Sequence, residues 1–185
     1  MKKIKMIVVA GVVLAMALSM VSCGNKGGAS EYENGEALLG AVYNTYSEED
    51  KLPVCGGNGE NGNPEGPGAF TLDNGEEFET VTGFPADYIE NVSDAATMMH
   101  LMNANNLTAA AFKFDGDTNA MIDAYTKSID DKSWLCGAPE TFVLMKADGY
   151  IISVFGENGM VDSFVKYTEG LIENTEVVVN QPVTE

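Results

Sequence analysis

Arginine is absent from this 185-residue sequence, and its ten basic residues are all lysine. Aspartate and glutamate together number 28, which gives a net charge of −18 at pH 7. A protein that binds nucleic acid needs a basic surface to displace the counterions of the phosphates. The composition therefore excludes nucleic acid as a partner, and it also argues against electrostatic attachment to anionic lipid headgroups.

Histidine occurs once, at His100, inside an apolar run. A serine or cysteine nucleophile needs a neighbouring base, and the sequence contains no G-x-S-x-G pattern. No glycine-rich phosphate loop leads from a predicted strand into a predicted helix. We therefore expect that the protein is not an enzyme and that it carries no cofactor.

An apolar segment follows the first lysines of the chain. Residues 6–18 contain no charge, and Lys2, Lys3 and Lys5 precede them. The run is too short to span a bilayer stably, because about 20 apolar residues are needed for that. Residues 1–22 are therefore predicted to be an export signal peptide.

This segment closes with Met20-Val21-Ser22-Cys23. The four residues resemble the lipobox of bacterial lipoproteins, with Met20 in place of the usual leucine. In that family the peptide is cut before the cysteine, which then carries a diacylglycerol with fatty acyl chains such as palmitate. The resemblance implies that Cys23 is lipidated. It also implies a location on the extracytoplasmic face of the cell membrane. Residues 24–30 are small and polar, so residues 23–34 are predicted to be the lipid anchor and a flexible tether.

Two further cysteines, Cys55 and Cys136, remain after Cys23 is assigned to the anchor. An extracytoplasmic compartment permits a disulfide between them, and such a bridge would close a long loop. Two unpaired thiols are the alternative, because the sequence does not show whether the two Cα atoms lie within bonding distance.

Apolar periodicity and turn residues divide residues 35–173 into the elements of a single domain. Hairpins are predicted at about 95–114 and 141–155, the second with Asp148-Gly149 as its turn. Helices are predicted at about 36–46, 118–131 and 158–171. We expect an α+β fold, in which an antiparallel sheet built from the two hairpins carries helices packed on one face.

Three segments outside these elements are assigned from composition. Residues 55–68 are so rich in glycine and asparagine that they are predicted to form a mobile surface loop. Asp73-Asn74-Gly75 is predicted to be the turn of a small additional hairpin. Residues 174–185 are predicted to be a C-terminal tail.

The order of these elements supports a second resemblance. Together with Met102-Asn103, Ala110-Ala111-Phe112-Lys113, Trp134 and Gly149-Tyr150-Ile151-Ile152, it is similar to a family of small lipoproteins from Gram-positive bacteria. The similarity covers roughly residues 36–171. That family has no assigned function, so the resemblance implies an uncharacterised envelope lipoprotein and indicates no catalytic residue.

Met98, His100 and Met102 are the first candidate metal ligands. On a strand the three side chains share one face, and thioether and imidazole groups suit copper. Methionine is also a common filler of apolar cores, so a structural role explains the same residues.

Asp115, Asp117 and Asn119 have the spacing that opens a calcium-binding loop. The full pattern requires glycine at its sixth position and glutamate at its twelfth, where this chain has Ala120 and Thr126. Capping of the following helix by Asp117 or Thr118 is the simpler interpretation.

These observations favour a lipid-anchored extracytoplasmic module that binds an unknown protein or small molecule without catalysis. The alternative is an envelope protein that binds calcium or copper through its acidic surface or its methionine-histidine cluster.

Replacing the lipidation residue tests the anchor. Two or three acyl chains each bury many CH₂ groups, at about 0.8 kcal/mol per group, which holds a domain stably on a membrane. We expect Cys23→Ser to yield a soluble or unprocessed protein when cell fractions are separated by ultracentrifugation. A Cys23→Ser protein that is processed and still sediments with membranes like the parent would contradict the anchor.

Overall fold

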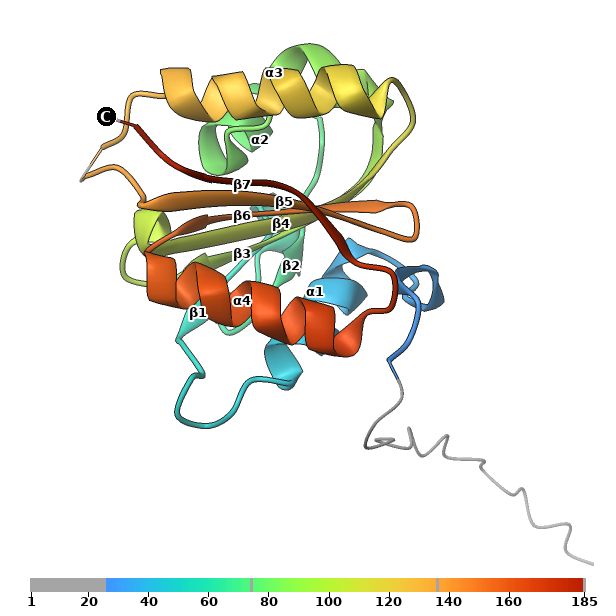
Figure 1. Ribbon diagram of the computed structural model, residues 1–185, viewed down its shortest axis with the longest axis vertical. Coiled ribbons are helices and arrows are strands. Elements are labelled where there is room, and N and C mark those ends of the chain that lie inside the picture. The colour runs from blue at the N-terminus through green and yellow to red at the C-terminus, as the bar shows by residue number, and fades with distance from the viewer. Residues whose placement is uncertain (1–25, 74, 136, 185) are drawn as a thin grey trace, which may run out of the picture.

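The computed structural model of the protein describes residues 26–73, 75–135 and 137–184. An antiparallel sheet with strand order β1-β3-β4-β6-β5-β7 runs through its middle, and β2 also pairs with β3 (Figure 1). The strands are β1 (Val54–Cys55), β2 (Gly68–Ala69), β3 (Val92–His100), β4 (Leu107–Phe114), β5 (Thr141–Ala147), β6 (Tyr150–Gly156) and β7 (Glu176–Pro182).

Both predicted hairpins are present. β3 pairs with β4 and β5 pairs with β6, both antiparallel, and β4 joins the two hairpins by pairing with β6. The turn between β5 and β6 places Asp148 and Gly149 at φ angles of 42° and 89°. Asp-Gly suits this turn, because both central residues need a positive φ to match the twist of the strands. The α+β class is therefore confirmed.

Helices cover both faces of the sheet rather than one, which corrects the predicted arrangement. α1 (Gly35–Asn44) and α4 (Asn158–Leu171) lie on one face, and α2 (Gly75–Thr82) and α3 (Thr118–Asp131) lie on the other (Figure 1). Every residue of β6 is buried, so neither face of this strand can be left to water.

None of the helices in the described ranges has the length and apolar character needed to cross a membrane. Short 3₁₀ turns join the elements: η1 (Ala29–Glu31), η2 (Gly59–Asn61), η3 (Ala86–Asn91) and η4 (Ala104–Asn106).

The two faces carry two separate cores. Aromatic rings dominate the core beneath α2 and α3, where Phe84 contacts Phe112 and Tyr125 with ring centroids 5.0 and 5.4 Å apart. The hydroxyl of Tyr125 donates to Thr82 O at 2.8 Å and lies 3.0 Å from Ser153 Oγ. Complete burial of Tyr125 raises the pKa of its hydroxyl to about 12, so this internal hydrogen-bonded group stays neutral.

Residues 55–68 fold against the sheet, which corrects the prediction of a mobile loop. β1 and β2 begin and end this segment, and both pair with the outer edge of β3. Between them Gly56 exchanges backbone hydrogen bonds with Asn63 at 2.9 and 2.8 Å. A Cβ atom on Gly56 would lie 2.0 Å from Thr97 O. Glycine is therefore required here by close backbone approach, a use of glycine that composition does not distinguish from flexibility.

Two other segments also differ from the prediction. Gly75 begins the helix α2 instead of ending a hairpin turn, and Glu76 and Glu77 stand favourably in its first turn. Residues 176–182 of the predicted tail form β7, which pairs with β5 along its length. β7 takes its structure from a strand that is distant in the sequence, so local composition misleads there.

Two glycine substitutions should change stability in opposite directions. We expect Gly56→Ala to destabilise the domain by about 1–3 kcal/mol, because the added methyl group meets backbone on both sides. Gly170→Ala is the matched control: it lies in α4 with open space around it, so alanine should stabilise the helix by up to about 1 kcal/mol. Urea unfolding of both variants measures the difference. Equal stabilities would show that residues 55–68 do not pack as described.

Candidate functional site

The structure separates the three members of the methionine-histidine cluster. Met98 is fully buried in the core beneath α1 and α4, whereas Met102 is 81% exposed beyond the end of β3. His100 Nδ1 accepts hydrogen bonds from the backbone N–H groups of Met102 and Asn103, both at 3.3 Å. The histidine therefore shapes the turn that follows β3, and the two methionines do not join it in one site.

The acidic candidates serve the start of α3. Asp117 is the N-cap residue, and its Oδ1 accepts from the backbone N–H groups of Asn119 and Ala120, both at 3.1 Å. The carbonyl of Asp115 accepts from Asn91 Nδ2 at 2.7 Å. The two hydrogen bonds of Asp117 satisfy the helix terminus, as the capping interpretation requires. In the described ranges no three His, Cys, Asp or Glu side chains lie close enough together to hold a metal ion.

The cysteines fall partly outside the described residues. Cys55 is half-buried in β1 opposite Met99, and it carries no disulfide to another described residue. Cys136 and the proposed lipidation residue Cys23 both lie outside the described residues. The disulfide between Cys55 and Cys136 and the lipidation of Cys23 therefore stay predictions.

A groove of about 640 Å³ lies between α2 and α3, and Lys132 is its cationic residue. Lys132 Nζ donates to Thr80 O at 2.9 Å in the last turn of α2, and it lies 5.4 Å from the ring centroid of Trp134. Partial burial removes water from the ammonium group and lowers its pKa. A cation at the C-terminal end of a helix satisfies free carbonyl groups, so the contacts of Lys132 indicate a capping role.

Three exposed apolar side chains lie on two loops at one end of the sheet. Leu101 and Met102 follow β3 and are 52% and 81% exposed, and Leu135 follows α3 and is 84% exposed. We call these three residues the apolar tip. Large apolar side chains exposed to this degree are a recognised mark of interaction surfaces when they occur together.

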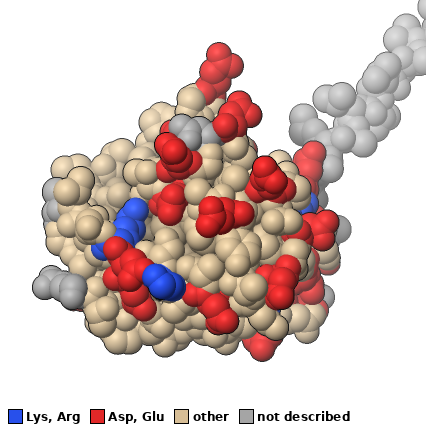
Figure 2. Space-filling model, turned by 90° about the horizontal axis from the view of Figure 1, so that it is seen from above, with Lys and Arg blue, Asp and Glu red and all other residues tan. Residues whose placement is uncertain are grey.

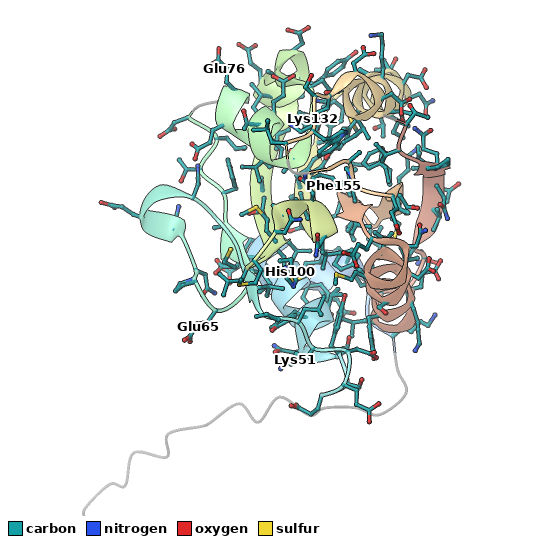
Figure 3. All side chains as sticks on the ribbon, turned by 90° about the vertical axis from the view of Figure 1, so that its left-hand side faces the viewer. Lys51, Glu65, Glu76, His100, Lys132 and Phe155 are labelled. Carbon is teal, nitrogen blue, oxygen red and sulfur yellow. The ribbon has the colours of Figure 1, made fainter. Side chains whose placement is uncertain are left out.

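Asn105 ties these two loops together. Its Nδ2 donates to the carbonyl groups of Leu135 and Gly137, at 2.5 and 2.7 Å. Asn103 fixes the same turn from within, because its Oδ1 accepts from Asn105 N and its Nδ2 donates to Asn106 Oδ1. Figure 3 looks onto this end of the molecule, with His100 near its centre. The loops that carry the apolar tip are therefore held by several hydrogen bonds.

The described chain enters the fold at the opposite end of the sheet. Residues 27–31 pack against the domain there and Ala29 is fully buried, which corrects the prediction of a flexible tether for this part of 23–34. Gly27 N donates to Leu171 O at 3.0 Å, and Gly27 O accepts from Glu173 N at 2.8 Å. The next residue, Gly28, lies against Asp148 in the turn between β5 and β6. Because Leu107 pairs with Gly156 and Lys113 with Tyr150, this turn and the apolar tip lie at opposite ends of β4 and β6 (Figure 1). Strands of this length separate the two ends by about 25 Å.

No protein-family model, curated protein or solved structure matches this chain. A functional assignment therefore depends on the geometry of the chain's own residues. Among them the apolar tip is the feature that sequence reasoning missed. Its one local signal was the pair Leu101-Met102 beside a turn. The link from this turn to the loop of Leu135, through Asn105, needs the folded chain.

Removing the Asn105 donors should loosen both loops. Asn105→Asp keeps the shape of the side chain but replaces the two N–H donors with a carboxylate that faces two carbonyl oxygens. We expect a local loss of about 1–3 kcal/mol. Hydrogen exchange should accelerate at residues 101–106 and 133–139 and stay unchanged in β4 and β6. Unchanged exchange in the 133–139 loop would contradict the link between the loops.

Proposed function

We propose that this protein is a lipid-anchored extracytoplasmic module that binds a protein partner through its apolar tip and catalyses no reaction. The observation that carries the proposal is the position of the apolar tip, at the end of the sheet opposite the entry of the N-terminal chain. A tether attached at Gly27 would hold the opposite end of the sheet close to the membrane. The tip would then point away from the lipid, toward other envelope proteins.

The chemistry of the tip suits binding. When a partner removes exposed apolar surface from water, the binding free energy becomes more favourable by about 25 cal/mol per Å². The hydrogen bonds of Asn103, Asn105 and His100 fix the loop conformations before a partner arrives, so little loop entropy remains to be lost on binding. Leucine and methionine side chains also adapt to an irregular partner surface.

Three groups of the kinds that catalysis uses are engaged in structural contacts. His100 Nδ1 accepts two backbone hydrogen bonds, and Lys132 caps α2. The buried Tyr125 hydroxyl bonds to Thr82 and Ser153 inside the aromatic core. These contacts support a binding role, because an acid or base in catalysis must reach the substrate within hydrogen-bonding distance.

Site-specific photocrosslinking on intact cells tests the proposal. A photoreactive residue at Met102 should give a discrete adduct with one partner protein. The same residue at Asp148, at the other end of the sheet, should not give that adduct. Identical adducts from both positions would contradict a partner surface at the tip.

Matched variants separate apolar contact from loop shape. The double variant Leu101→Ser with Leu135→Ser removes apolar area and should abolish the adduct from Met102. The double variant Leu101→Met with Leu135→Met keeps the apolar area and should preserve the adduct.

Purified protein should show no turnover on hydrolase or redox substrate panels. A turnover that disappears in His100→Ala while the fold is retained would overturn the non-enzymatic assignment.

A further inference from the structure

The two edges of the sheet differ in whether further strands cover them. The outer edge of β3 is covered by β1 and β2, the two short strands at either end of residues 55–68. At the other edge, β7 pairs with β5 on its inner side, and no strand of the described chain pairs with its outer side. An open edge presents unpaired backbone N–H and C=O groups, which can template the addition of another strand.

β7 has few of the features that block such an addition. Its sequence, Glu-Val-Val-Val-Asn-Gln-Pro, contains no lysine, the residue that most often protects an edge, and three valines favour extended backbone. A bulge at Val178 and the terminal Pro182 limit the open edge to a short stretch. That stretch is long enough to hold a peptide of a few residues.

The register shows which backbone groups face outward. Val183 N donates to Glu140 O at 3.0 Å, and Gln181 stands opposite Phe142. Antiparallel neighbours alternate between positions that exchange hydrogen bonds and positions that do not. The backbone N–H groups of Gln181 and Val179 therefore point toward β5, and the backbone N–H of Asn180 points outward. Asn180 is exposed, so this donor is open to a partner strand.

Negative charge borders the open edge. Asp130 of α3 lies directly beside β7, because its Oδ1 accepts from Gln181 Nε2 at 3.1 Å. Glu176 begins the strand and is exposed, and Lys146 of β5 stands opposite it, so Asp130 is the carboxylate of the edge without a lysine as its cross-strand partner. Among the charged side chains on the face over α2 and α3, seen in Figure 2, acidic ones predominate, as expected from the net charge of −18. A second copy of this chain would bring the same negative surface to the edge and be repelled.

We propose that β7 accepts an extended, lysine- or arginine-rich segment of a partner protein as an additional strand. Backbone hydrogen bonds, including one from Asn180 N–H, would give the pairing, and Asp130 and Glu176 would select cationic side chains. The inference does not depend on the apolar tip, which lies on different residues. Strand addition at β7 and binding at the tip can therefore fail independently.

A synthetic peptide tests the charge requirement. The probe is a fluorescein-labelled heptapeptide of alternating lysine and valine, compared with its glutamate-valine counterpart by fluorescence anisotropy with the purified domain. We expect the lysine peptide to bind at least about tenfold more tightly and to weaken as salt increases. Hydrogen exchange should slow in β7 when the lysine peptide is added. Equal affinity of the two peptides, or unchanged exchange in β7, would overturn the proposal.

Two substitutions at one position test the backbone pairing. Asn180→Pro removes the outward N–H, and an edge strand tolerates proline where its N–H faces solvent. Asn180→Ala keeps that N–H and is the matched control. We expect about tenfold weaker binding of the lysine peptide for Asn180→Pro and little change for Asn180→Ala. Unchanged exchange in β3–β6 would verify that the proline variant is folded. Equal binding by both variants would overturn strand addition.

A third substitution tests the carboxylate at the edge. Asp130→Asn keeps a hydrogen-bonding side chain next to Gln181 but removes the charge. The lysine peptide should therefore bind about threefold more weakly, with a smaller salt dependence.

Sedimentation equilibrium of the unmodified domain tests whether a second copy of the chain occupies β7. A dimer that Asn180→Pro dissociates would show that a second copy occupies β7, which would overturn the assignment to a cationic partner.

Discussion

Burial of both faces of β4 and β6 is the constraint on which the remaining architecture depends. Ala109, Ala110 and Ala111 are fully buried on β4, and their side chains alternate between the two cores. Small side chains let the helices approach closely: a Cβ atom on Gly35, at the start of α1, would lie 2.7 Å from Ala111 O. Asp94 of β3 fixes this contact, because its Oδ2 accepts from Gly35 N at 2.8 Å. Helices are therefore required on both sides of the sheet, and α1 is bound at its first residue.

The sequence predicted the elements whose signals are local. The hairpin of β5 and β6 is specified by Asp148-Gly149, and α1 by its cap at Asn34, whose Oδ1 accepts from Ala37 N at 2.8 Å. It did not predict β7, because a run of valines after a helix becomes a strand only when β5 offers an edge. Residues 55–68 were misjudged for a related reason, since glycine serves close approach to β3 there.

In the candidate site, too, the sequence predicted features with local signals and missed those that depend on residues far apart in the chain. Asp117 was correctly interpreted as a cap, because the cap and the N–H groups it satisfies are neighbours in the sequence. The grouping of Met98 with Met102 assumed that β3 continues to residue 102, but the strand ends at His100 and the chain turns. The apolar tip combines residues separated by more than 30 positions, joined through the side chain of Asn105. No period or motif in the sequence carries that information.

The junction between Gly27 and the end of α4 has a mechanical consequence. A pull along the N-terminal chain acts first on the two backbone hydrogen bonds that join Gly27 to Leu171 and Glu173. These bonds lie between α4 and β7, at the periphery of the domain, and they can break one after the other as the chain peels away. The sheet behind them keeps its strand pairs during this release. Ala29, two residues further along, is fully buried in the core beneath α1 and α4, so only the residues before it can detach before the load reaches that core.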